Sequence, residues 1–279
     1  MKAGPVRLRR QAWRALALLL LCGLSLQLFF VLRIALMVVV DPQSSAFQRS
    51  EIWRLLTEKH RVDWSQQWVA DARLSPQLKR AVIASEDASF VEHSGVEWDA
   101  LEKAWEKNQQ SEARAERRNA QLDKRRSAPA NAASKSRPQA AARVAPPSAR
   151  PAPRAVPKLV GGSTISQQLA KNLFLSGERT VLRKAQEIVL TFALETLCSK
   201  RRILEIYLNS VEWGEGLFGA QAAAQHYFRI DAAHLDAARA ARLAVMLPAP
   251  KRFERNPGSP YVVGRAATVM ARMGAVDLP

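Results

Sequence analysis

Apolar residues concentrate first in a long run from Ala15 to Val40, which only Gly23, Arg33 and a few mildly polar residues interrupt. As a helix rising about 1.5 Å per residue, this run is longer than the roughly 30 Å core of a bilayer. A cleaved signal peptide would have an apolar region of about 7–15 residues and a small-residue cleavage site, and the run has neither. The pattern predicts one retained transmembrane helix at 15–40, after a basic tail at 1–14.

After this run the apolar spacing is mainly helical. From Ser44 to Trp105 the pattern is mostly helical, and no segment alternates as a half-buried strand would. Pro248 and Pro250 are expected to end the last Ala-rich helix. The sequence therefore predicts a mainly α domain over 41–279. Its clearest helical segments are 181–192, 203–208, 220–227 and 237–247.

A basic segment at about 106–158 interrupts this domain. Its first half is charged and compatible with a helix, whereas residues 127–157 are mostly Ala, Pro and Arg with almost no large apolar side chain. Such a composition cannot bury enough surface to offset the entropy of ordering. We therefore expect a disordered insert at 106–158.

The 279-residue chain has a formal net charge of +17, which favours nucleic acid, anionic membranes or phosphate-bearing substrates as partners. More basic residues precede the apolar run than follow it closely, so the positive-inside rule places the tail in the cytoplasm and residues 41–279 outside. That location, with no recognisable binding motif, argues against nucleic acid. The basic residues compared are Lys2, Arg7, Arg9, Arg10 and Arg14 before the run and Arg49, Arg54 and Lys59 after it.

The cysteines and histidines suggest no further chemistry. Cys22 lies in the predicted membrane helix and Cys198 in a later helix, so we expect no disulfide. The histidines lack metal-ligand spacing, and the residues therefore predict no metal site.

Glu86 and Asp87 form an acidic pair directly after the apolar residues 81–84. A Glu held beside apolar walls has a raised proton affinity and suits general acid or base work. Taken alone, the pair is more often a surface feature.

A helix start is predicted at Gly161-Gly162-Ser163-Thr164, because Thr164 and Gln167 have the spacing of a capping box. Free backbone N–H groups at such a start, with the helix dipole, attract anions. Lys171, further along the same helix, would add a full charge. An ordinary capped helix with a solvated lysine is the alternative.

A third group contains Arg179, Arg183, Lys184 and Glu187. Glu187 follows Arg183 by four residues and Lys184 by three, so all three sit near one helix face. They form either an exposed ladder of ion pairs or a carboxylate held among cations that face a pyrophosphate.

Together these blocks resemble the peptidoglycan glycosyltransferases of family 51, in particular their monofunctional membrane-anchored branch. The resemblance covers roughly Leu78 to Pro257. Its motifs occur in order: Glu86 to Gly95, Gly161 to Asn172, the Arg179–Glu187 group, Lys200 to Asn209 with Trp213 to Gly219, and Arg255-Asn256-Pro257. We read the fourth of these as scaffold and groove wall.

The resemblance implies a lysozyme-like glycosyltransferase domain with a small membrane-facing lobe, anchored in the bacterial cytoplasmic membrane with its catalytic domain in the periplasm. It implies that lipid II and the nascent glycan strand are the substrates. The strand would be transferred to the 4-hydroxyl of lipid II in a β-1,4 link, with inversion and release of undecaprenyl pyrophosphate. Membrane lipids and a cell-wall synthesis complex are the other partners expected.

The resemblance also implies roles for individual residues. Glu86 would be the general base, and Glu187 would hold the neighbouring cations or a divalent cation such as Mg²⁺ at the pyrophosphate; no cofactor is otherwise required. The cations Lys171, Arg183 and Lys184 would stabilise the departing pyrophosphate. The remaining residues expected to contact substrate are Asp87, Phe90, His93, Ser163, Thr164, Gln167, Gln168, Asn172 and Arg179.

Two features depart from the family pattern. Ser89 stands where relatives often have a basic or larger polar residue, which puts a phosphate contact there in doubt. The insert falls between the first two motifs. Its charge could hold the membrane-facing lobe on anionic lipid, at about 1 kcal/mol per basic residue. Alternatively, the insert could have no effect on function.

Other functions remain to be distinguished. A lysozyme-like lytic enzyme would act on finished peptidoglycan with one Glu, but would not need cations for a pyrophosphate. An inactive membrane scaffold is the other alternative. Neither a Ser-x-x-Lys tetrad nor Lys-Thr-Gly occurs, so no transpeptidase activity is expected.

Overall fold

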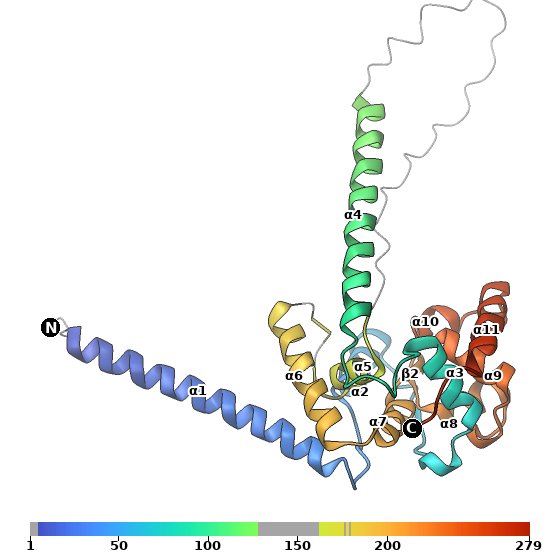
Figure 1. The fold of residues 1–279 in the computed structure, drawn as a ribbon, viewed down its shortest axis with the longest axis horizontal. Coiled ribbons are helices and arrows are strands. Elements are labelled where there is room, and N and C mark those ends of the chain that lie inside the picture. Colours follow the sequence, from blue (N-terminus) through green and yellow to red (C-terminus); the bar gives the residue numbers. More distant parts are fainter. Residues whose placement is uncertain (1–4, 128–161, 176, 179) are drawn as a thin grey trace, which may run out of the picture. The chain divides into compact units, whose positions relative to one another are not determined.

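The computed structural model describes residues 5–127, 162–175, 177–178 and 180–279. It divides into two compact units, Met1–Val96 with Ser163–Pro279, and Glu97–Gly162. The mainly α prediction is confirmed (Figure 1). The first unit contains α1 (Pro5–Leu36), α2 (Ala46–Arg54), η1 (Leu55–Lys59), η2 (Asp71–Arg73), α3 (Pro76–Glu86), α5 (Ile165–Phe174), α6 (Val181–Leu197), α7 (Lys200–Ser210), α8 (Ala220–Phe228), η4 (Ala232–His234), α9 (Ala237–Met246), α10 (Pro250–Phe253) and α11 (Pro260–Met273).

The N-terminal apolar helix is present, but its end differs from the prediction. Residues Arg9–Leu36 are long and apolar enough to cross a membrane, and α1 ends at Leu36 rather than Val40. Three β-branched valines follow at 38–40, and such side chains lose rotamer freedom in a helix. The end of α1 also belongs to the domain, because Ile34 and Met37 are buried in its core.

Two groups of helices enclose this core. In one, α9 packs against α3 and α11, and in the other α5 packs against α6 and α7 (Figure 1). The centre of α7 is fully buried, with Leu204 and Tyr207 each 1 % exposed. Since α3 and α5 carry the first two motifs, their packing determines where the candidate catalytic groups lie.

A small sheet was not predicted. β3 (Leu217–Phe218) pairs in parallel with β1 (Ser65–Gln66) and antiparallel with β2 (Glu212–Gly214). Strands this short cannot show an alternating pattern in the sequence. Gly216 lies in the hairpin turn between β2 and β3: it has a φ of 70°, and a Cβ there would lie 2.0 Å from the carbonyl oxygen of Asp63.

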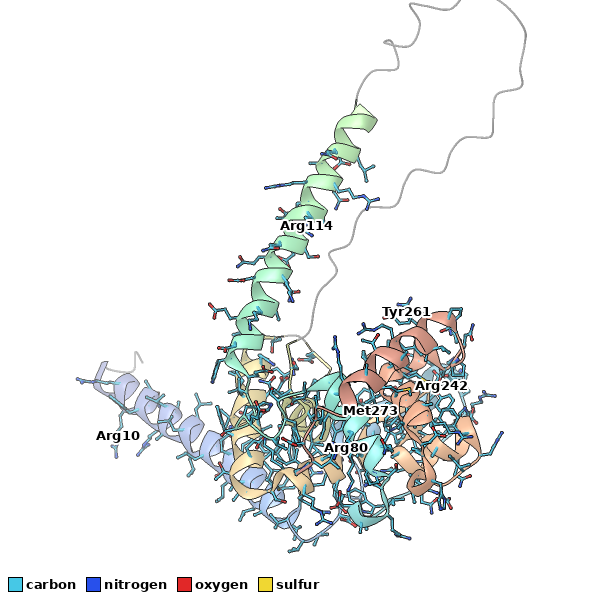
Figure 2. The ribbon with its side chains drawn as sticks, turned by 45° about the vertical axis from the view of Figure 1, so that its right-hand side comes forward. Arg10, Arg80, Arg114, Arg242, Tyr261 and Met273 are labelled. Atoms are coloured by element: carbon cyan, nitrogen blue, oxygen red, sulfur yellow. The ribbon has the colours of Figure 1, made fainter. Side chains whose placement is uncertain are left out.

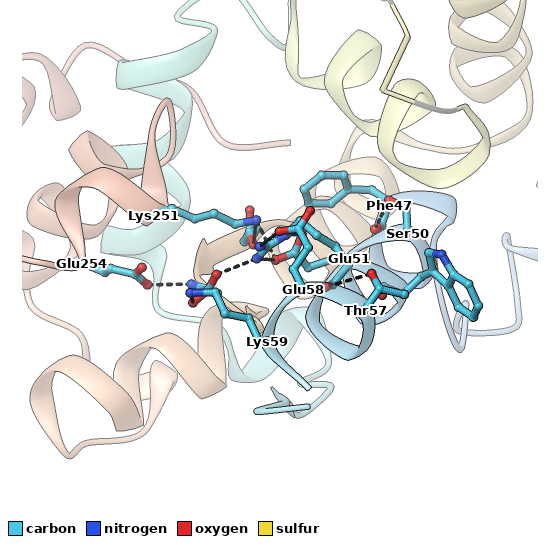
Figure 3. Close-up of polar contacts among 12 residues, drawn as sticks. Phe47, Ser50, Glu51, Thr57, Glu58, Lys59, Lys251 and Glu254 are labelled. Atoms are coloured by element: carbon cyan, nitrogen blue, oxygen red, sulfur yellow. Dashed lines mark hydrogen bonds and ion pairs between the residues drawn. The ribbon is translucent and has the colours of Figure 1, made fainter. Parts of the chain in front are cut away.

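Ion pairs join α2 to β2 and α10 (Figure 3). Nζ of Lys251 lies 2.6 Å from Oε1 of the buried Glu51 and 3.3 Å from Oε1 of Glu212. Arg54 contributes a second cation to Glu51, also at 2.6 Å. Burial raises the pKa of Glu212 to about 7, even though Lys251 lowers it.

The second unit contains α4 (Trp98–Ser127), which is charged along its length; Arg114 is one of the exposed side chains (Figure 2). The first part of the predicted insert, residues 106–127, is therefore helical, and the expected disorder is corrected there. Glu, Lys, Arg, Gln and Ala dominate this stretch, and they are good helix formers. Residues 128–158 of the predicted insert lie outside the described residues.

Candidate active site

Glu86 is the last residue of α3. Pro76 occupies the first turn of this helix, and the apolar residues 81–84 are buried just before the acidic pair. Burial raises the pKa of the partly buried Glu86, a hydrogen bond from Gln168 lowers it, and the charge of Asp87 raises it again, with a net rise. A carboxylate of raised proton affinity at the edge of the core is suited to accept a proton.

Gln168 links Glu86 to Tyr207. Its Nε2 donates to Oε2 of Glu86 at 2.9 Å, and its Oε1 accepts a hydrogen bond from the Tyr207 hydroxyl, also at 2.9 Å. The carbonyl oxygen of Ser163 is a longer second acceptor, 3.5 Å from Nε2. Both ends of the amide therefore have partners within the protein.

Asp87 joins the first motif to the start of α5. Its Oδ2 accepts from the backbone N–H of Ile165 at 2.9 Å, and its Oδ1 lies 2.9 Å from Nε2 of His93. The N–H of Gly95 donates to Nδ1 of His93, so the ring proton lies on Nε2 and points to Asp87. Asp87 is buried and Phe90 fully so. These side chains hold the loop, and the substrate contacts expected of Asp87, Phe90 and His93 stay predictions.

The start of α5 is capped within the protein. Thr164 Oγ1 accepts from the N–H of Gln167 and donates to the carbonyl of Gly95 at 2.6 Å, and the predicted capping box is confirmed. Two N–H groups of the predicted cradle have partners within the protein, because Asp87 accepts from that of Ile165 and Thr164 accepts from that of Gln167. Thr164 and Gln167 are also buried, so they stabilise the helix rather than line a surface.

Glu187 is buried on α6 between two cations. Its Oε2 lies 2.8 Å from Nη1 of Arg183, and its Oε1 lies 2.5 Å from Nζ of Lys184. Thr180 caps this helix by accepting from the N–H of Arg183. The burial of Glu187 argues against a fully exposed ladder of ion pairs, and the two pairs leave a local excess of one positive charge beside the partly exposed Lys184.

The other predicted site residues are spread along α5. Ser163 precedes its cap and Asn172 lies in its last turn, both partly buried. Lys171 is exposed and also lies in the last turn, about 10 Å along the helix axis from Thr164. Arg179 lies outside the described residues.

Two contributors to the site were missed. Tyr207 was read as scaffold, although a Tyr in an apolar helix needs a partner for its hydroxyl. Lys200 donates from Nζ to the carbonyl of His93 at 2.6 Å and to Oε1 of Glu195 at 2.9 Å. Its Nζ also lies over the ring of Phe90, 4.6 Å from the ring centroid, so Lys200 helps to fix the first motif.

These motifs also match a known family. The family model described as Transglycosylase matches residues 54–117 and 153–274, which include α3, α5, α6 and α7. The chain belongs to the transglycosylase family. The lysozyme-like fold and the glycosyltransferase class follow from this membership. The match to the transglycosylase family extends to residue 117, so it includes part of the predicted insert and leaves 118–152 unmatched.

Several relatives within the transglycosylase family are similar over most of their length. A protein of Burkholderia thailandensis is 45% identical over 282 residues, covering 99% of this chain and 93% of its own. One of Paraburkholderia phytofirmans is 42% identical, covering 100% and 96%. One of Bordetella pertussis is 46% identical over 239 residues, covering 86% and 82%. Each is named a biosynthetic peptidoglycan transglycosylase.

Proposed function

We propose that this chain polymerises the glycan strands of peptidoglycan from lipid II, transferring the growing strand to the 4-hydroxyl of the incoming disaccharide. The observation that carries this proposal is the pairing of two unlike carboxylates in one transglycosylase fold. Glu86 is partly buried with a raised pKa and accepts a hydrogen bond from the neutral amide of Gln168, whereas Glu187 is buried between Arg183 and Lys184. One suits a base, and the other suits a holder of positive charge.

In the proposed step, a carboxylate oxygen of Glu86 takes the proton of the acceptor's 4-hydroxyl. The deprotonated 4-hydroxyl oxygen forms a bond to the anomeric carbon of the donor strand, from the face opposite the pyrophosphate. The bond between this carbon and the pyrophosphate oxygen breaks, and its electron pair leaves with undecaprenyl pyrophosphate. The β-1,4 link forms with inversion. Such base assistance contributes typically about 10²–10⁴-fold to the rate.

The cations act on the leaving group. Arg183, Lys184 and Lys171 would stabilise the charge that develops on the pyrophosphate, which is an electrostatic role. Both oxygens of Glu187 already contact cations. Of the two roles left open for Glu187, holding these cations is therefore the one we propose, and no step is assigned to a divalent metal.

The membrane is part of the proposal because both substrates are lipid-linked. Residues Arg9–Leu36 would span the cytoplasmic membrane with the N-terminus inside, which the excess of basic residues before the span supports. Exposed apolar residues also occur on α6, where Val181 and Leu182 are 89% and 81% exposed. Phosphatase fusions at each terminus test the orientation: activity from the C-terminal fusion alone is expected, and activity from the N-terminal fusion alone would reverse it.

The function is tested by supplying the detergent-solubilised chain with lipid II and, separately, with finished peptidoglycan. A glycan ladder from lipid II and no fragments from peptidoglycan are expected. Fragments from peptidoglycan without a ladder would establish the lytic alternative. A folded protein that acts on neither substrate would establish the scaffold.

A further inference from the structure

Tyr207 lies one side chain away from Glu86, and Gln168 is the connection between them. We propose that Tyr207 is a positioning residue for the base: its hydroxyl fixes the orientation of the Gln168 amide, and this amide holds the Glu86 carboxylate. The inference rests on the proposed role of Glu86. Tyr207 belongs to the fourth motif, which we read as scaffold, and the inference assigns it a defined effect on the reaction.

The hydroxyl of Tyr207 has a fixed position. Tyr207 is 1 % exposed and lies in the buried centre of α7, between the equally buried Leu204 and Leu208. From there the hydroxyl donates to Oε1 of Gln168 at 2.9 Å. Burial, with the charges of Glu86 and Asp87, raises the pKa of Tyr207 well above its usual value. The hydroxyl therefore stays protonated, and remains a donor, throughout the working pH range.

A protonated Tyr207 determines the direction of both hydrogen bonds that connect it, through Gln168, to Glu86. A glutamine amide has one accepting end and one donating end. With Oε1 turned to the Tyr207 hydroxyl, Nε2 is turned to Oε2 of Glu86. An ionised carboxylate can only accept, so a flipped Gln168 would oppose its oxygen to Glu86 and lose that hydrogen bond, and the Tyr207 hydroxyl would have to change from donor to acceptor. Tyr207 thus favours the one amide orientation that stabilises ionised Glu86.

This role differs from packing. A phenylalanine at 207 would fill the same volume and keep the ring contacts in the core, but it would leave Oε1 of Gln168 without its donor. The amide would then turn more freely, and the carboxylate of Glu86 would lose a well-oriented donor. Because that hydrogen bond favours the charged form, its loss raises the pKa of Glu86.

The test compares Tyr207→Phe, Gln168→Ala and the double variant in the full-length chain with lipid II across pH. Tyr207→Phe is expected to lower kcat about 10-fold, because it weakens the hydrogen bond from Gln168 to the charged Glu86 carboxylate. KM should stay within about twofold, and the acid limb of the kcat/KM profile should move to higher pH. The double variant should be no worse than Gln168→Ala, since both act through one amide.

Tyr227→Phe is the matched control, because Tyr227 is partly buried and its hydroxyl donates to the carbonyl of Trp213, outside this set of contacts. It should change neither the rate nor the profile. An unmoved acid limb in Tyr207→Phe, or a further proportional loss in the double variant, would overturn the inference. Melting temperatures measured alongside identify any variant that fails to fold.

A second readout separates this inference from the proposed function. The Glu86 carboxyl can be titrated directly by NMR of carboxyl-¹³C-labelled protein, with Glu86→Gln assigning the signal. A higher pKa of Glu86 in Tyr207→Phe supports the positioning role of Tyr207, even if Glu86→Gln still polymerises lipid II and Glu86 is not the base. An unchanged pKa of Glu86 overturns the positioning role of Tyr207, even if Glu86→Gln is inactive.

Discussion

Oδ2 of Asp87 accepts a hydrogen bond from the backbone N–H of Ile165 at 2.9 Å, which joins two motifs that are 78 residues apart in the sequence. Ile165 is the first residue of α5, so the carboxylate occupies the positive end of that helix. The same carboxylate is 2.9 Å from Nε2 of His93. The residue beside the proposed base thus fixes the helix that carries Gln168.

Asp87→Ala is expected to lower the free energy of unfolding by about 2 kcal/mol or more, because it leaves the N–H of Ile165 and Nε2 of His93 without their acceptor. Thermal unfolding in detergent measures this. Glu92→Gln, an exposed carboxylate in the same loop, is the control and should have almost no effect. Equal stability of Asp87→Ala and wild type would show that α5 needs no anion at its start.

Ile34→Ala tests whether the end of the apolar helix belongs to the domain core. Ile34 is fully buried, whereas Leu32 is 60% exposed. Removing a buried aliphatic side chain costs about 2–5 kcal/mol, so Ile34→Ala should melt well below wild type and Leu32→Ala close to it. Similar melting temperatures for the two variants would mean that α1 only anchors the domain.

Glu187→Gln tests whether a carboxylate must hold the cations. Without its charge, Arg183 and Lys184 lose the ion pairs that fix them at 2.8 and 2.5 Å. We expect kcat to fall by about 100-fold with little change in KM, since the cations act on charge that develops only in the transition state. A higher KM with unchanged kcat would instead show equal effects on ground and transition states.

Glu212→Gln tests how the protonation of Glu212, which pairs with Lys251 between β2 and α10, makes the stability of the protein depend on pH. The pKa of Glu212 is raised from 4.5 to about 7 in the folded protein. Between these pH values the folded chain holds a proton that the unfolded chain has released, so the contribution of this group to stability falls as pH rises.

The Gln variant cannot titrate, and it should therefore raise the melting temperature more at pH 8 than at pH 5. Glu92→Gln again serves as the exposed control. A gain that is the same at both pH values, or larger at pH 5, would contradict the raised pKa of Glu212.

Much of the fold follows from local sequence. The capping box of Thr164 and Gln167 places the start of α5, and helical spacing predicts α8 and α9 almost to the residue. The grouping of Arg183, Lys184 and Glu187 is equally local, because side chains three or four residues apart on a helix are neighbours.

Contacts between distant segments could not be predicted in this way. Nothing near Asp87 in the sequence indicates that its partner is the N–H of Ile165, and that contact occupies one N–H group of the expected anion cradle. The contact of Tyr207 with Gln168 likewise depends on the packing of α7 against α5. Strand β3 pairs with β1 across about half the chain, and its two residues have no detectable period.

The central claim is that Glu86 is the general base of a glycan polymerase. The most direct test is polymerisation of lipid II by wild type and Glu86→Gln, with Glu92→Gln as the matched control and products sized on a gel. The account predicts ladders from wild type and the control, and a rate at least about 100-fold lower from Glu86→Gln. A Glu86→Gln ladder that forms as fast as that of wild type would contradict it.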